Sequence, residues 1–172
     1  MDKIFGTVLS ILSVFSNFGR LMFYKKSFVE EFYYTKDDGY GGYEKITNTE
    51  KADNYSINLC LEIHNKSNNN RTIRDLKIAY EKDKKQIKSA PLKDDSTKTK
   101  IAMANHYEDV TSLNIPAKTI STFNLHNIIN KDDEIWDYAL NSTAIYLTYR
   151  NERNHIKKVL LKKKGGKDGN KK

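Results

Sequence analysis

The four histidines and the single cysteine are the residues best suited to chemistry in this chain of 172 residues. His64, His106, His126 and His155 are scattered along the sequence without the spacing of metal ligands. Cys60 alternates with apolar residues, and nothing nearby in the sequence identifies the base that a nucleophilic cysteine needs. We therefore predict no catalytic residue, no metal site and no cofactor, and expect a protein that is not an enzyme.

Two loops instead carry side chains suited to contact with a partner. Residues 106–109 (His-Tyr-Glu-Asp) form the densest titratable cluster, which suits a cation site or, more simply, a solvated polar loop. Residues 39–43 (Gly-Tyr-Gly-Gly-Tyr) are spaced like a phosphate-binding loop, but no Lys-Ser/Thr pair follows them. Exposed tyrosines provide large and rigid contact area. We predict contacts with a protein partner at Tyr40, Tyr43, His106 and Tyr107.

The strands that must hold these loops are predicted by alternation of apolar and polar residues. Residues 55–64 alternate most regularly, and residues 72–80 follow after an Asn-rich turn. We predict that these two strands form an antiparallel hairpin. The apolar phase changes between Ile73 and Leu76, which indicates a bulge or a late strand start.

A second antiparallel hairpin is predicted from residues 144–149 and 155–161. The sequence between the two hairpins predicts four further features. These are strands at 110–115 and 119–125, a helical turn or irregular crossover at 134–140, and an edge strand at 86–88 within a charged loop.

The composition favours one small β domain. The chain is 38% hydrophobic and 30% charged, but 11 Tyr and 7 Phe supply large apolar side chains for a modest core. Six or more short strands without alternating helices predict a mainly β fold, an antiparallel immunoglobulin-like β-sandwich at residues 28–162. Residues 163–172 are expected to form a disordered Lys- and Gly-rich tail.

Residues 1–27 differ from the rest because no charged residue occurs between Ile4 and Gly19. A helix over about residues 3–24 would be hydrophobic and amphipathic. We predict that its apolar face contacts a membrane through Ile4, Phe5, Val8, Ile11, Leu12, Phe15, Phe18 and Met22. A short span, an interfacial helix, and a helix packed on the β domain or on a second copy are the alternatives. More cations follow the helix than precede it, which would place the C-terminal domain in the cytoplasm.

The net charge of +8 is concentrated near the C-terminus. Lysines there could contact anionic lipid or another polyanion, and we single out Lys162, Lys163, Lys164 and Lys167. Together these features predict a non-catalytic, membrane-associated interaction module. Its Lys- and Asn-rich composition is typical of bacteria, phages or mobile elements, and no small-molecule substrate is inferred. The alternative is a soluble protein that binds nucleic acid or another polyanion and uses its first helix to oligomerise.

Overall fold

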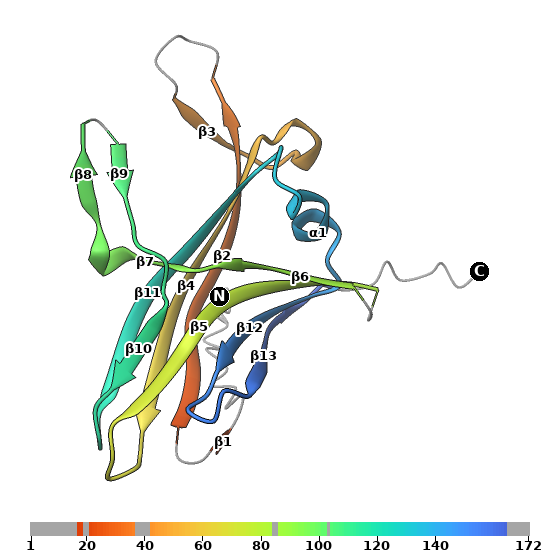
Figure 1. Ribbon diagram of the computed structural model, residues 1–172. Helices are drawn as coiled ribbons and strands as arrows, with labels where there is room; N and C mark the ends of the chain where they lie inside the picture. Colours follow the sequence, from red (N-terminus) through yellow and green to blue (C-terminus); the bar gives the residue numbers. More distant parts are fainter. Residues whose placement is uncertain (1–16, 19–20, 37–41, 84–85, 103, 165–172) are drawn as a thin grey trace, which may run out of the picture.

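The computed structural model describes residues 17–18, 21–36, 42–83, 86–102 and 104–164. Figure 1 shows two antiparallel β-sheets that form the layers of a sandwich, with one separate hairpin beside them. The fold is therefore mainly β, as predicted.

The larger layer, sheet A, has the strand order β1-β2-β4-β11-β7, and β3 pairs with the last residues of β2. Strand β2 is the longest, with 15 residues. The strands of sheet A are β1 (Asn17–Phe18), β2 (Leu21–Thr35), β3 (Tyr43–Ile46), β4 (Asn54–Asn65), β7 (Lys93–Asp94) and β11 (Ile120–Asn130).

The smaller layer, sheet B, has the strand order β10-β5-β12-β13, and β6 also pairs with β5. Its strands are β5 (Arg71–Lys82), β6 (Gln86–Pro91), β10 (Ser112–Ile115), β12 (Ala144–Arg150) and β13 (Ile156–Lys163). The separate hairpin consists of β8 (Thr99–Ile101) and β9 (Ala104–His106). The helical segments are the 3₁₀ turns η1 (Thr49–Lys51) and η2 (Asp95–Thr97) and the α-helix α1 (Trp136–Asn141). The crossover predicted at 134–140 thus contains a short helix.

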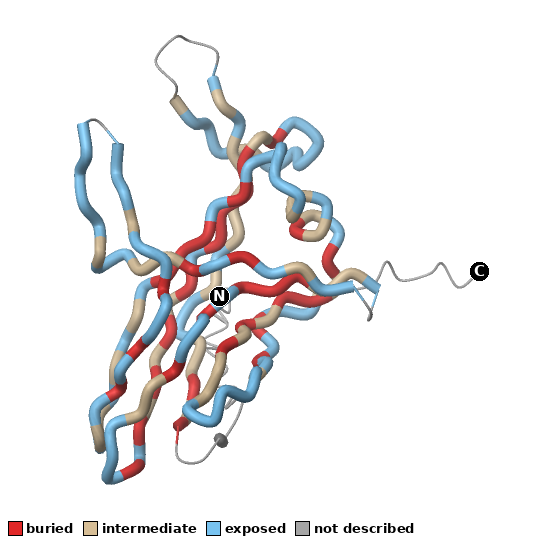
Figure 2. Tube along the Cα trace, viewed as in Figure 1, coloured by how far each residue is buried: buried red, intermediate tan, exposed pale blue. Residues whose placement is uncertain are grey.

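The core lies between the two sheets, and buried positions alternate with less buried ones along much of the strands that line it (Figure 2). Strand β4 shows the pattern most clearly, since Ile57, Leu59, Leu61 and Ile63 are all buried while Asn58 is exposed. Full burial of such side chains stabilises the fold by about 1.5–3 kcal/mol each. Aromatic rings also meet across the layers, with Phe23 of β2 stacked on Tyr149 of β12 at 5.0 Å between centroids.

The hairpin predicted for β4 and β5 is wrong, because the two strands belong to different sheets. Strand β4 pairs with β2 and β11, whereas β5 pairs with β6, β10 and β12. The connecting arch is fixed by the buried amide of Asn65, which donates to the carbonyl oxygens of Asn69 and Ile115, both at 2.9 Å. Its oxygen accepts from the Ser67 hydroxyl at 2.6 Å. A polar side chain so fully satisfied can be buried where the chain crosses between layers.

Two other strand predictions are confirmed. Strands β12 and β13 form the predicted C-terminal hairpin. In β5, Ile73 and Leu76 are both buried, although residues 73 and 76 of a regular strand would point to opposite faces. Asp75, which lies between them, has a positive φ of 50°. The register of β12 against β5 shifts at this point, between Thr148 and Arg150. This irregularity lets both apolar residues face the core.

The helix predicted over residues 3–24 is wrong for residues 21–24, which begin strand β2. Phe23 and Leu21 are core residues there, so their apolar character serves the sandwich and not a membrane face. Sheet A thus includes residues 21–27, which the sequence had led us to place before the domain. Residues 1–16, 19 and 20 lie outside the described residues. Within the described part of the chain, no helix has the length and apolar character needed to cross a membrane.

Candidate interaction surface

Two hairpins project from the edges of sheet A at one end of the sandwich. Strands β2 and β3 form one of them at the β2 edge, and β8 and β9 form the other beyond β7 at the opposite edge. Figure 1 shows both extending in a similar direction, the β2–β3 hairpin past the ends of the long strands and the β8–β9 hairpin from a base beside the middle of β11. Strands β2 and β7 are three strand spacings apart, or about 14 Å. The two hairpins therefore project from opposite edges of the same sheet.

The β2–β3 hairpin presents tyrosine side chains to solvent. Tyr43, the first residue of β3, is 66% exposed, and Tyr34 of β2 is exposed as well. The Lys36 amide donates to the Gly42 carbonyl at 2.8 Å and thereby closes the ladder below the tip. Beneath the tyrosines, Lys45 pairs with Glu31 at 2.5 Å.

The β8–β9 hairpin is exposed on both of its faces. All six of its strand residues are exposed, and Ile101 at the end of β8 is 59% exposed. A two-stranded ribbon of this kind is only marginally stable in water by itself. Its position therefore depends on the contacts at its base.

The base of this hairpin is anchored by a histidine on the outer face of sheet A. His126 of β11 is buried, and its Nδ1 lies 2.5 Å from Oδ1 of Asp95 in η2. The ring of Tyr107, which follows β9, meets the His126 ring edge-on at 4.5 Å between centroids. The Glu108 amide also donates to Thr97 Oγ1 at 2.9 Å. The hairpin thus leaves the sheet from a well-packed base while its strands stay exposed.

The sheet between the two hairpins adds apolar area. Val29 of β2 and Ile128 of β11 lie on the outer face of sheet A and are exposed. Among the described residues, nine large hydrophobic side chains are exposed, and five of them lie in this region; we call these five the hairpin surface. They are Val29, Tyr34, Tyr43, Ile101 and Ile128. Apolar residues gathered at one end of a domain mark a candidate site of protein contact.

The predicted partner-contact residues fall on or near these hairpins. Tyr43 is on β3, and His106 is the exposed last residue of β9. Tyr107 is half-buried against His126, so it supports the hairpin rather than presenting a free ring. Tyr40 lies outside the described residues. Sequence reasoning missed Ile101, because residues 100–107 carry no regular alternation.

The predicted lysine contacts divide into two kinds. Lys162 and Lys164 both pair with Glu30 of β2, the second at 3.1 Å, and Lys164 also donates to the Ala139 carbonyl of α1 at 2.9 Å. They hold β13 against the other layer. Lys163, between them, is exposed, and Lys167 lies outside the described residues.

Glu30 is the half-buried centre of this ion-pair cluster. Its carboxylate also accepts a hydrogen bond from the Tyr55 hydroxyl at 2.6 Å. Burial alone would raise the pKa of Glu30, but the hydrogen bonds from Lys162 and Tyr55 and the charge of Lys164 outweigh it and lower the pKa. The carboxylate is therefore charged at neutral pH.

The predicted membrane-contacting residues lie almost entirely beyond the described chain. Only Phe18, in β1, and Met22, in β2, are placed. Met22 is half-buried on the outer face of sheet A, where its sulfur lies 3.6 Å from the Tyr24 hydroxyl. Membrane contact through this segment stays a prediction.

Groups that could carry catalysis are dispersed over the described residues. No three His, Cys, Asp or Glu side chains gather there in an arrangement that could hold a metal ion. Cys60 is half-buried on the outer face of β4, where its register neighbours are Ser27 and Asn124. His64 and Glu62 form a pair at 2.6 Å that packs beside Tyr24. The His64–Glu62 pair is a contact between neighbouring side chains on the outer face of sheet A.

Comparison with known proteins places the sandwich in a family. The model of the YopI Ig-like domain matches residues 19–162. The SPbeta prophage-derived uncharacterized protein YopI of Bacillus subtilis (strain 168) is 23% identical over 164 residues, which cover 94% of this chain and 90% of that protein. This relative supports the predicted bacterial or phage origin.

Two solved structures are matched over most of this chain at low TM-scores. One is an uncharacterized β-sandwich protein from Clostridium difficile 630, with a TM-score of 0.39 and 8% identity over 88% of this chain and 93% of the other. The second is a structural genomics target solved by X-ray crystallography, with a TM-score of 0.39 and 9% identity over 86% of this chain and 85% of the other.

Proposed function

The chain belongs to the YopI Ig-like domain family, and we propose that it is a non-catalytic interaction module that binds a protein partner through the hairpin surface. The observation that carries the proposal is the exposure of Tyr43 and Ile101 on two hairpins at one end of the sandwich. Immunoglobulin-like sandwiches host many unrelated functions, so the proposal rests on this surface and not on the fold.

The chemistry of the surface favours a protein as the partner. Tyrosine and aliphatic side chains stand among both signs of charge, since Glu44 pairs with Lys36 on the first hairpin and Lys100 lies on the second. Interfaces between proteins combine aromatic anchors with a polar rim in this way. A nucleic-acid surface would instead be dominated by cations.

We also propose that residues 1–16 hold the module at a membrane surface. The support is the uncharged stretch from Ile4 to Ser16, which precedes β1. Two of the C-terminal lysines predicted to reach anionic lipid are paired with Glu30, which weakens the alternative of polyanion binding through the tail.

Site-specific photo-crosslinking in the cells that produce this protein tests the hairpin surface. A photoreactive phenylalanine analogue at Ile101 should give a discrete adduct. The same analogue at Ile120 is the matched control, since Ile120 is 62% exposed on the same sheet but at the other end of β11. We expect no adduct at that position.

A second substitution tests whether both hairpins contact one partner. Tyr43→Ala should reduce the Ile101 adduct at least threefold if the same protein bridges the two hairpins. Equal adducts at Ile101 and Ile120, or no adduct at Ile101, would contradict the proposed surface.

A further inference from the structure

A cavity of about 320 Å³ opens between the layers at the end of the sandwich opposite the hairpin surface. Its lining comes from the start of β2, the start of β5 and the turn between β12 and β13. Leu21, Ile73 and Tyr149 contribute buried apolar side chains. The volume is at the lower limit for small-molecule sites, which range from about 300 to 1,000 Å³.

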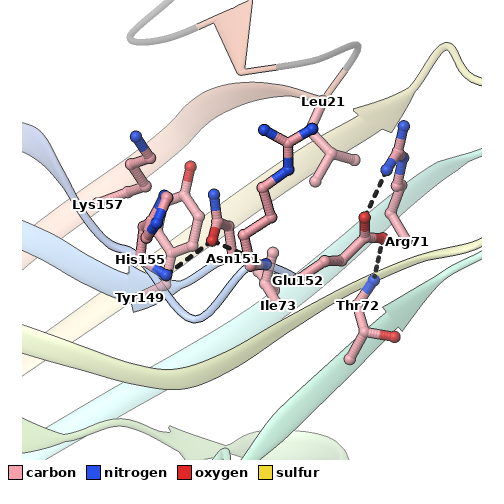
Figure 3. Close-up of a pocket in the computed structure, with 10 residues that line it drawn as sticks. Leu21, Arg71, Thr72, Ile73, Tyr149, Asn151, Glu152, His155 and Lys157 are labelled. Carbon is pink, nitrogen blue, oxygen red and sulfur yellow. Dashed lines mark hydrogen bonds and ion pairs between the residues drawn. The ribbon is translucent and has the colours of Figure 1, made fainter.

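The remaining lining is strongly basic. Arg71, Arg153, His155 and Lys157 contribute, against the single carboxylate of Glu152. Figure 3 shows Lys157, His155 and Tyr149 on one side of the cavity, and Arg71, Thr72 and Glu152 on the other. Three permanent cations and one anion leave a net charge of +2, with His155 counted as neutral. An anion entering the cavity is therefore attracted.

The one carboxylate is already neutralised. Glu152 accepts from Arg71 Nη1 at 2.5 Å and from the Thr72 amide at 3.4 Å, as the dashed lines in Figure 3 show. By contrast, the side chains of Arg153 and His155 form no ion pair with any described residue. These two groups can therefore receive a ligand without first breaking a bond within the described chain.

The turn that carries Arg153 and His155 is preorganised. The Asn151 side-chain oxygen accepts from the amides of Arg153, at 3.1 Å, and His155, at 2.9 Å. Asn154 has a φ of 61°, a conformation that asparagine adopts more readily than most residues. These bonds fix the backbone of the turn, so both residues stay beside the cavity and less backbone entropy is lost on binding.

We propose that this cavity binds a small carboxylate with a compact apolar body. The body would contact Leu21, Ile73 and Tyr149, and the carboxylate would meet Arg153 and His155 at the mouth. Arginine recognises planar carboxylates through paired hydrogen bonds. A bare phosphate would satisfy the cations but leave the apolar lining unused. The proposal is independent of the hairpin surface.

Titration of the full-length protein with phenylacetate, followed by two-dimensional amide NMR, tests the proposal. We expect saturable shifts at residues 71–73 and 149–157. The neutral isostere phenylacetamide should bind at least tenfold more weakly, and inorganic phosphate should do the same. A short peptide that ends in phenylalanine carries the same carboxylate and ring. If it bound more tightly than phenylacetate, the natural source of the ligand would be a peptide C-terminus.

Arg153→Gln should weaken phenylacetate binding at least fivefold. The matched control is Arg74→Gln, which removes an exposed arginine of β5 that does not line the cavity. Both positions are at the surface, so both variants should remain folded, and an unchanged amide spectrum outside the cavity would verify this. No saturable shift at these residues, equal binding of phenylacetamide or phosphate, or an equal effect of the two variants would overturn the proposal.

Discussion

Glu30 is the residue on which the contact between the first and last long strands depends. It lies in β2 of sheet A, and its carboxylate pairs with Lys162 and Lys164 at the end of β13 in sheet B. Its side chain is only 9% exposed, so the ion pairs are screened less than those at the surface. Removing one member of a buried charge cluster leaves the others without compensation.

Glu30→Gln should lower the free energy of unfolding by about 1–3 kcal/mol at pH 7, as measured by urea denaturation. The substitution keeps the size of the side chain but removes the charge that faces two ammonium groups. Glu134→Gln is the matched control, because Glu134 pairs with Lys88 at 3.0 Å in a fully solvated position. Its effect should be much smaller than that of Glu30→Gln, because a fully solvated ion pair contributes little to stability. Equal losses in both variants would contradict the role of burial.

The same cluster predicts how stability depends on pH. Because the pKa of Glu30 is lower in the folded state than in the unfolded state, its contribution is fully present above the unfolded value, about 4.3. The contribution is lost as the pH falls through the lower, folded value. Urea denaturation from pH 7 to pH 3 should therefore show the difference between wild type and Glu30→Gln shrinking below about pH 4.3. A difference that stays constant down to pH 3 would contradict this assignment.

Tyr33 provides a second titration, at alkaline pH. Its hydroxyl donates to Glu31 Oε2 at 2.6 Å, and this bond, with burial and the carboxylate charge, raises the pKa of Tyr33 to about 12. A raised folded pKa gives stability that is present below the unfolded value, about 10, and is lost as the pH rises through 12. The ¹³Cζ NMR signal of Tyr33 should therefore titrate near pH 12. Glu31→Gln should move the midpoint toward 10, whereas Glu44→Gln on the same hairpin should leave it unchanged.

At the scale of elements, we expect the β8–β9 hairpin to keep its position through the contacts at its base, because its own strands are fully exposed. His126→Asn removes both the contact with Asp95 and the ring against which Tyr107 packs. We expect amide hydrogen exchange to accelerate at least tenfold in residues 97–109 while β4 stays protected, because the core does not depend on this histidine. The control is His106→Asn, at an exposed position in β9. Equal acceleration in both variants would show that His126 does not anchor the hairpin.

Part of the fold could be predicted from the sequence, including β4, β12 and the C-terminal hairpin, but the long strand β2 and the pairing partners of β4 could not. The alternation in residues 55–64 and 144–149 is a local pattern, and the strands predicted from it match the bounds of β4 and β12 to within one residue. The arch between β4 and β5 depends on Asn65 reaching the carbonyl of Ile115, fifty residues away along the chain. A short Asn-rich loop is compatible with either a hairpin or an arch, and only this distant contact distinguishes them.

Candidate contact residues were predictable only where residue type alone indicates a role. Tyr43 is exposed in a Gly-rich turn, and both features are visible in the sequence. Ile101 and the basic cavity were not predictable. The first depends on a hairpin that lies off both sheets, and the second on three segments that are brought together only by the fold. Lys162 and Lys164 show the converse, because the sequence predicts a solvated lysine-rich run, whereas both cations pair with Glu30.

At the scale of the whole molecule, the first and last long strands, β2 and β13, meet along one edge of the sandwich. Besides the Glu30 cluster, Lys25 Nζ of β2 donates to the Leu161 carbonyl of β13 at 2.5 Å. Burial, together with the nearby charge of Lys162, lowers the pKa of Lys25. Strand β2 is therefore a structural part of both the sheet and the contact between layers. The chain from Leu21 onward cannot leave the domain to enter a membrane without dismantling this edge.

Membrane contact at the N-terminus would therefore be made by residues that precede β2. Residues 1–16 precede β1, and the stretch from Ile4 to Ser16 carries no charge. The proposed attachment at a membrane surface would use this stretch. The full-length protein should sediment with liposomes and be released by carbonate, and a variant lacking residues 1–16 should stay in solution. Sedimentation of the shortened variant would contradict membrane contact through this segment, and resistance to carbonate would contradict surface attachment.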